Sequence, residues 1–262
     1  MADDGVHRNV LQEAAVTFDA PSTFAVVSKE GDDTNGVGSF ESPLLTIAAG
    51  IAALTAARNT LIVLPGDYDE VELVWPNITG LAVVAPFGEV NVTNSDAAAA
   101  VLSIAPTFTA STFEATIKGA VNLAGTGAQI GLSIANAGMT KKLNVYIDGL
   151  SAEVGTSGDS IDIAGTVSGQ ALRVYAKNLD LEGLFHFTAN DAGSRCRIST
   201  SRLLGGYTTT GAVTAESTLM GVVMLADGLS IATEWLSSNA GCIYQLDADP
   251  ATCSAFVDTA NG

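Results

Sequence analysis

The sequence predicts an all-β solenoid, a parallel β-helix, because a short alternating pattern recurs along its 262 residues. The pattern has the form Leu-x-Val-x-x-x-x-Leu, and its starts lie between 24 and 32 residues apart, which suits one turn of a solenoid. The four closer copies are residues 143–150, 172–179, 196–203 and 222–229, and the two looser copies are residues 81–88 and 113–120.

A second β-like segment follows the copies of this pattern, separated from them by Gly, Asn, Asp, Ser and Thr, which suit turns. Alternation with a period of two residues, not helical periodicity, dominates residues 80–230. Each coil should therefore hold two or three short strands joined by turns. The second segments are residues 129–134, 160–163, 184–187, 212–215 and 242–246.

The alternation also assigns the side chains to two faces of the first strand in each coil. Like positions of successive coils should stack about 4.8 Å apart, which places Tyr146 against Tyr175 and Asp148 against Lys177. The predicted inward residues are Leu143, Val145, Ile147, Leu172, Val174, Ala176, Cys196, Ile198 and Thr200. The predicted outward residues are Asn144, Tyr146, Asp148, Arg173, Tyr175, Lys177, Arg197, Ser199 and Ser201.

The chain divides into three predicted regions. Residues 1–24 form a polar N-terminal arm without a clear period, residues 25–70 form a cap and the first coil, and residues 71–262 form the coils with a C-terminal cap. An Ala-rich stretch at residues 48–57 predicts a short helix. Ser42 is its expected N-cap and Pro43 its first helical residue.

The run from residue 25 to residue 70 resembles the opening of the pectin-lyase-like right-handed parallel β-helices, and the coil pattern extends the resemblance to about residue 250. The matching residues are Asp33, Asn35, Gly36, Pro43, Thr46, Ile47, Pro65, Gly66 and Tyr68. The resemblance implies a right-handed solenoid whose N-terminal helix covers an apolar end that would otherwise be an open sheet edge. Asp33 and Asn35 are then turn-formers and not ligands.

The chain is strongly acidic, with a formal net charge of −17 at pH 7. A protein without a basic stripe is not expected to bind nucleic acid, and repulsion disfavours anionic membranes. We expect no signal peptide, because the start lacks a basic and apolar run, and no membrane span, because no stretch approaches 18 apolar residues. Cys196 is expected to be a buried apolar residue, whereas Cys242 and Cys253 either pair or remain free thiols.

The sequence contains no recognisable catalytic constellation, so we expect neither enzymatic activity nor a cofactor or metal. Glycoside hydrolysis needs converging carboxylates, and the calcium-dependent lyases need several Asp and a base. Of the two histidines, His7 lies in the arm and His186 is expected to be a structural or surface residue. The remaining candidates are spaced as isolated carboxylates, namely Asp148, Asp162, Asp180, Asp191 and Asp227.

These features favour a non-catalytic structural protein of a phage-like virion, a homotrimeric capsid-decoration or spike protein anchored at the particle surface by its arm. Its expected partners are other copies of itself, virion capsid or tail proteins, and surface glycans. The expected subunit contacts are Tyr146, Tyr175, Arg173, Arg197, Val223 and Leu225.

Two alternatives stay open at this point. The cationic group of Arg173, Arg197, Arg202 and Lys177 is either a ladder that pairs with Asp148 and Asp180 or a contact patch for an acidic neighbour. The second alternative concerns the function of the whole chain, which would then be a carbohydrate-binding or carbohydrate-cleaving β-helix of the tailspike or lyase type. Aromatic residues in an outward groove would favour that function, but Trp75 and Trp235 both fall in connecting segments.

Overall fold

The computed structural model describes most of the chain between residues 23 and 246. The described residues are 23–96, 99–125, 129–154, 158–165, 171–189, 191, 193–205, 207–210, 216–223 and 243–246, of which 189, 208–210, 216–223 and 243–246 are described by their backbone only. The predicted arm, the segment 212–215, Leu225, Trp235, Cys242 and Cys253 lie outside these residues, apart from the end of the arm at Thr23 and Phe24.

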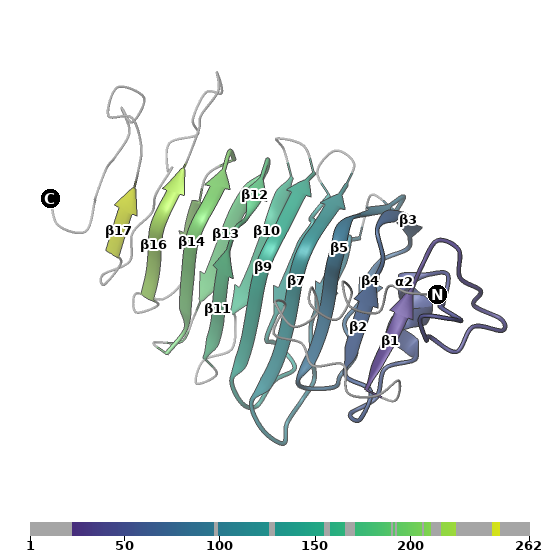
Figure 1. Cartoon of the computed structure of the whole chain (residues 1–262). Coiled ribbons are helices and arrows are strands. Elements are labelled where there is room, and N and C mark those ends of the chain that lie inside the picture. The colour runs from purple at the N-terminus through teal and green to yellow at the C-terminus, as the bar shows by residue number, and fades with distance from the viewer. Residues whose placement is uncertain are drawn as a thin grey trace, which may run out of the picture.

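The protein is all-β, and one short helix, α2 (Ile47–Ala52), occurs among the described residues. The described strands form two sheets, one of eleven strands and one of six (Figure 1). The long sheet contains β1 (Phe24–Val27), β2 (Thr60–Val63), β3 (Gly66–Glu70), β5 (Leu81–Asn94), β7 (Phe113–Ala124), β9 (Leu143–Glu153), β11 (Leu172–Lys177), β12 (Asp180–Leu181), β14 (Arg195–Leu203), β16 (Glu216–Val223) and β17 (Ile243–Leu246). The short sheet contains β4 (Leu73–Val74), β6 (Leu102–Ile104), β8 (Leu132–Ala135), β10 (Asp159–Gly165), β13 (Leu184–Ala189) and β15 (Tyr207–Thr210).

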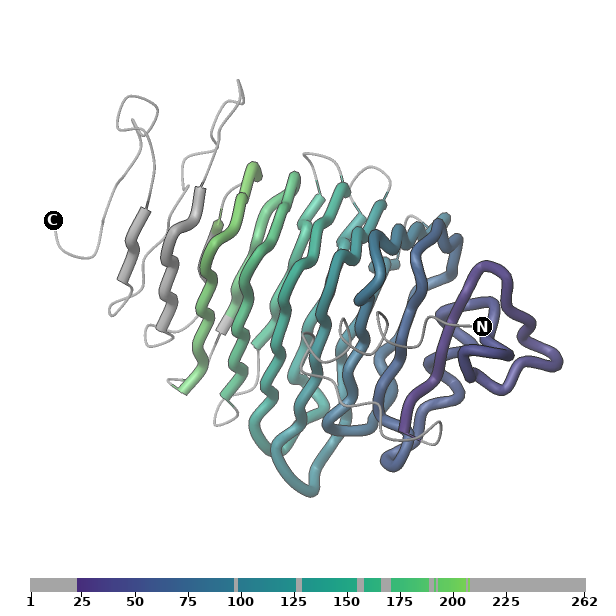
Figure 2. Tube along the Cα trace, in the orientation of Figure 1, coloured from purple at the N-terminus to yellow at the C-terminus, as the bar shows by residue number. Residues whose placement is uncertain are grey.

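Every pairing between the described strands is parallel. From β4 to β11 the chain alternates between the short and the long sheet, so each of the strands β4 to β9 lies beside the strand two places further along. The successive coils lie side by side in Figure 2. This arrangement fits the predicted parallel β-helix. The strands β9, β11, β14 and β12 also form a closed cycle of pairings, because β11 and β12 are successive segments of one rung that both lie between β9 and β14.

A single apolar core fills the space between the two sheets. Inward residues of successive strands stack in register, such as Val145 against Val174 and Val174 against Cys196. The core continues from the N-terminal helix to Leu203 and Tyr207. Burial of apolar surface at roughly 25 cal/mol per Å² makes this stack the main source of stability. Cys196 is fully buried and free, as predicted.

Four successive rungs of the long sheet, those of β7, β9, β11 and β14, turn a corner at one residue with positive φ. Gly119 (φ 108°), Gly149 (φ 94°), Asn178 (φ 54°) and Thr200 (φ 47°) follow one another in the strand register, and we call them the corner column. A left-handed residue interrupts the alternation, so the inward set shifts by one position after it. In β9, for example, Ile147 and Leu150 are both buried.

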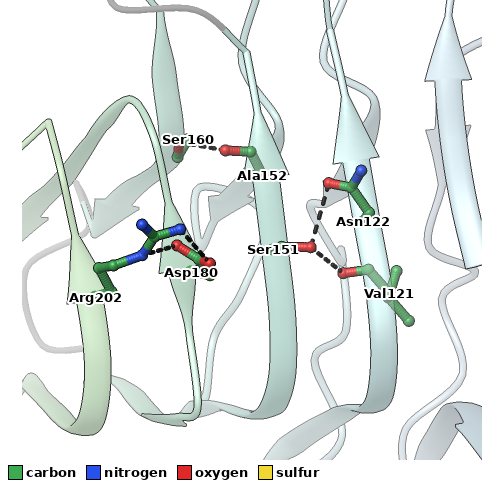
Figure 3. A network of polar contacts seen from close by, with 7 residues as sticks. All are labelled: Val121, Asn122, Ser151, Ala152, Ser160, Asp180 and Arg202. Atoms are coloured by element: carbon green, nitrogen blue, oxygen red, sulfur yellow. Dashed lines mark hydrogen bonds and ion pairs between the residues drawn. The ribbon is translucent and has the colours of Figure 1, made fainter. Parts of the chain in front are cut away.

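A ladder of polar side chains runs along the outward face just beyond the corner column. It consists of Asp67, Asn91, Asn122, Ser151, Asp180 and Arg202, which are register partners in turn. Hydrogen bonds link the first four residues. Asn91 Nδ2 donates to Asp67 Oδ1 at 2.9 Å, Asn122 Nδ2 donates to Asn91 Oδ1, and Ser151 Oγ donates to Asn122 Oδ1 at 3.2 Å. Arg202 closes the ladder with two bonds of 2.6 Å to Asp180 (Figure 3).

The N-terminal end of the sheet is covered by the helix and by the loop that precedes it. The apolar residues of α2 pack into the core beside β1 and β2, with Ile47 and Gly50 buried. The edge of β1 is bonded by the loop, since Val26 N donates to Gly38 O and Ser28 N to Leu44 O. Pairing an edge strand in this way removes a template for aggregation.

Arg58 holds this loop over the outer face of the first strands. Its guanidinium donates to the carbonyls of Phe24, Val37 and Gly38 at 2.7–2.8 Å. Phe40 of the loop packs on the ring of Phe24, and a second small apolar cluster forms there outside the main core. The outer face is therefore covered at β1 and β2.

The helix begins later than Pro43, its predicted first residue, and ends before residue 57, the end of the predicted stretch. Its N-cap is Thr46, whose hydroxyl accepts from Ala49 N, and not Ser42. Two distant carboxylates determine this start: Asp33 accepts from Leu45 N and Thr46 N, and Glu70 accepts from Ile47 N at 2.6 Å. Burial raises the pKa of Glu70 in this position. Asn35 does form a turn, because it donates to Asp32.

Three of the predicted pattern copies are out of register. Leu81 pairs with Ala115, whereas the prediction aligned it with Phe113. Cys196 pairs with Val174, whereas the prediction aligned it with Leu172. Val222 pairs with Ser201, so the last copy begins earlier than expected. Alignment by sequence alone missed these shifts because successive coils differ in length at their turns and corners.

Two predicted faces are also wrong, and one predicted strand lies in the other sheet. Thr200 is exposed and Ser201 is buried, because Thr200 occupies the corner and inverts the alternation that follows. Ser201 satisfies its buried hydroxyl with Leu179 N and Ser199 O. The predicted second segment 242–246 contributes β17, which pairs with β16 in the long sheet.

Replacing Gly119 by Ala should destabilise the protein more than replacing Gly80 by Ala. Both residues have positive φ, which costs an L-residue about 1–2 kcal/mol. A Cβ at Gly119 would also meet the carbonyl oxygen of Ala85 at 2.2 Å, whereas nothing lies within 4 Å of one at Gly80. Urea denaturation should show a further loss of roughly 1–3 kcal/mol for Gly119→Ala. Equal losses would show that the corners are not closely packed.

Replacing Thr200 by Asn should stabilise the protein. A β-branched residue is strained at a φ of 47°, whereas Asn tolerates this conformation, as Asn178 does in the preceding rung. We expect a gain of roughly 1 kcal/mol and a rise in Tm of about 2–4 °C. Thr116→Asn, in an ordinary strand position, is the control and should give no gain.

Candidate functional site

The outward face of the long sheet carries an open groove over β7, β9, β11 and β14. Its volume is about 530 Å³, and we call it the tyrosine groove. One wall is the column Thr116, Tyr146, Tyr175 and Arg197, and the other is the column Lys118, Asp148, Lys177 and Ser199. The residues between the columns point into the core, so their backbone forms the floor.

The two tyrosines stack on each other because they are register partners in neighbouring parallel strands. The ring centroids lie 5.3 Å apart and the planes differ by 11°. Tyr146 is 38% exposed. Burial of part of the side chain, with the nearby Glu114 carboxylate, raises the pKa of Tyr146.

The groove is locally cationic on an acidic chain. Lys118, Lys177 and Arg197 line it together with the one carboxylate of its described lining, Asp148. Asp148 binds Lys177 Nζ at 3.1 Å and accepts from Asn178 Nδ2 at 2.7 Å. An exposed pair such as Lys177 with Asp148 contributes little to stability.

The structure brings together three of the six predicted contact residues, since Tyr146, Tyr175 and Arg197 line the groove. Arg173 lies one outward position nearer the start of β11, beside Asn144 and Arg195. Val223 ends β16 and its side chain is not described, and Leu225 lies outside the described residues. Arg202 belongs to the polar ladder and pairs with Asp180, as one of the two open alternatives supposed.

Sequence reasoning missed Thr116 and Lys118, although both belong to the looser copy at 113–120. Extending the outward columns to that copy would have found them, because Thr116 pairs with Tyr146 and Lys118 with Asp148. The aromatic candidates considered for a groove were the two tryptophans. Trp75 is buried at 4% exposure, and the tyrosines take the outward position instead.

The described lining of the groove combines two stacked rings, three cationic side chains and a single carboxylate. Hydrolysis of a glycosidic bond uses two facing carboxyl groups, whereas the described lining offers Asp148 alone, already bonded to Lys177 and Asn178. Stacked aromatic rings, aliphatic side-chain stems and cationic ends are the usual constituents of protein contact surfaces.

No protein-family model, curated protein or solved structure matches this chain. Among the described residues, no helix has the length and apolar character needed to cross a membrane.

The stacked tyrosines should be energetically coupled. In a double-mutant cycle of Tyr146→Ala and Tyr175→Ala, we expect a coupling energy of about 0.5–1.5 kcal/mol in the free energy of unfolding. The control cycle combines Tyr146→Ala with Val74→Ala, since Val74 is exposed on the short sheet. Its coupling should be close to zero, and comparable values in both cycles would contradict the stack.

Proposed function

We propose that the chain is a non-catalytic structural protein, a right-handed parallel β-helix whose copies associate as a homotrimer through the tyrosine groove. The observation that carries this proposal is the groove itself, an open surface with stacked tyrosines and excess positive charge on a chain of net charge −17. An acidic neighbour complements it, and another copy of this chain is such a neighbour.

The outward face is covered at one end of the long sheet and open further along, which supports packing of a second copy over β9 and β11. Near β1 and β2 the same columns are covered by the loop around Phe40, whereas at β9 and β11 they are open and Tyr146 is 38% exposed. The second copy would then cover a stripe that the chain itself covers only at its N-terminal end. Burial of tyrosines at the centre of an interface contributes strongly to affinity.

The orientation of the rings favours a protein partner over a sugar. Tyr146 and Tyr175 use one face each for their mutual stack, at an angle of 11° between planes. A sugar ring packs on an aromatic face, so the stack removes two of the four faces from use. The exposed edges and hydroxyls suit hydrogen bonds and apolar contacts with a second chain.

The place of this protein in a phage-like virion is part of the same proposal. It is supported by the resemblance of residues 25–70 to pectin-lyase-like β-helices and by the two parallel sheets, which fit a solenoid. In this proposal the trimer decorates a capsid or forms a spike, and the N-terminal arm attaches it to the particle.

Glycan binding is the second candidate, favoured by the open groove and its mixture of Tyr, Lys, Arg and Asp side chains. Under this alternative a monomer with an unoccupied groove would be the active form. A glycan array probed with the purified chain distinguishes it, with Tyr175→Ala as the variant that should lose binding.

Light scattering coupled to size exclusion tests the trimer. The wild-type chain should elute with a mass near three times 26.6 kDa. Tyr175→Asp should lower this mass towards that of a single chain, because it places a charge in the apolar centre of the contact. Val74→Asp is the matched control, since Val74 is 56% exposed on the other sheet, and it should leave the mass unchanged. A monomeric wild type, or a Tyr175→Asp trimer, would contradict the proposal.

A further inference from the structure

The short sheet carries a cluster of one imidazole and two carboxylates on its outward face, far from the tyrosine groove in the fold because it belongs to the opposite sheet. Nδ1 of His186 lies 3.2 Å from Asp162 Oδ1 and 4.0 Å from Asp159 Oδ2. One ligand atom from each residue lies within 4.8 Å of the others. We call these three residues the Asp–His cluster.

An irregularity in β10 brings the second carboxylate to this face. The register between β10 and β13 shifts between Asp159 and Ile161, so Ser160 and Ile161 both point into the core. Regular alternation would place Asp159 inward with Ile161, whereas the bulge turns Asp159 outward beside Asp162. Ser160 secures the bulge, because its hydroxyl accepts from Gly183 N at 2.8 Å and donates to Ala152 O at 3.2 Å.

His186 is held with Nδ1 towards the carboxylates. Its neighbours Phe185 and Phe187 are buried in the core, which fixes the imidazole on the outward face beside its register partner Asp162. Thr188 Oγ1 lies 3.3 Å from Nε2 on the other side of the ring. Protein metal sites commonly hold a ligating histidine in this way, with a second group bonded to the nitrogen that does not bind the metal.

We propose that the Asp–His cluster binds a divalent transition-metal ion of the Zn²⁺ class, with Nδ1 of His186 and one oxygen each from Asp159 and Asp162 as ligands. At metal–ligand distances of 2.0–2.2 Å, neighbouring ligand atoms of a tetrahedral site are about 3.4 Å apart. The two oxygens lie 3.2 and 4.0 Å from Nδ1, all three ligand atoms lie within 4.8 Å of one another, and side-chain rotation would bring them to this geometry. Water completes the coordination.

The donor set selects the class of metal. An imidazole nitrogen suits Zn²⁺ and its neighbours in the first transition row, whereas Ca²⁺ and Mg²⁺ prefer sites made of oxygen alone. Two carboxylates beside one imidazole provide such a mixed donor set at one point.

Such an ion would join two successive coils, because Asp159 and Asp162 belong to β10 and His186 belongs to β13. Binding to the folded state alone raises the apparent stability. Two consequences can therefore be measured, a stoichiometric uptake of metal and a higher melting temperature in the presence of the metal.

Isothermal titration of the full chain with ZnCl₂, after treatment with EDTA and dialysis, tests the site. We expect one Zn²⁺ per chain, with at least tenfold weaker binding for His186→Gln and for Asp162→Asn. Thr188→Val keeps all three ligands and should weaken binding by about tenfold, as loss of an orienting partner usually does. Co²⁺ in place of Zn²⁺ should give a visible absorption band that Zn²⁺ removes.

His7→Gln is the matched control, because His7 is the other histidine of the chain. It should bind Zn²⁺ as the wild type does and show the same rise in Tm. Circular dichroism checks that the variants are folded, and the Co²⁺ band of the wild type provides a readout that needs no variant. Absence of stoichiometric uptake by the wild type, loss of binding in His7→Gln alone, or displacement of Zn²⁺ by equal Ca²⁺ would overturn the proposal.

Discussion

Parallel stacking in register is the constraint on which the rest of the structure depends. Each strand of the long sheet lies beside the corresponding strand of the next rung, so a residue type repeated at one position forms a column. Columns of apolar residues make the continuous core, and columns of polar residues make the ladder from Asp67 to Arg202. The tyrosine stack follows from the same rule, because two tyrosines at one position must lie about one strand spacing apart.

The corner column shows how this constraint limits the sequence. In the four rungs from β7 to β14 the turn between the two segments occurs at the same point, and a left-handed residue provides it. Gly119 and Gly149 take this conformation without strain, Asn178 tolerates it, and Thr200 takes it at a cost. At this corner β5 has a longer connecting segment than β7, and this segment places Phe87 against Phe40 of the covering loop.

The two sheets present different chemistry to the outside. The long sheet offers stacked rings and cationic side chains over several rungs, which suits an extended contact with another chain. The short sheet offers three ligand atoms at one point, which suits a single ion. Since the two surfaces lie on opposite sheets, a change at one tests its own role without altering the other.

The period of two residues and the inward positions of Leu143, Val145, Leu172 and Val174 were determined by the sequence alone, because burial of alternate apolar residues leaves a direct pattern. The pairing of Tyr146 with Tyr175 and of Lys177 with Asp148 followed from it and is confirmed. The start of the helix at Thr46 was decided by tertiary structure, since Asp33 and Glu70 reach its first residues from elsewhere in the chain. The faces of Thr200 and Ser201, and the meeting of Asp159 with Asp162, were decided in the same way. A single left-handed residue or bulge inverts the alternation that follows it, and the hydrophobic pattern does not show where such a residue lies.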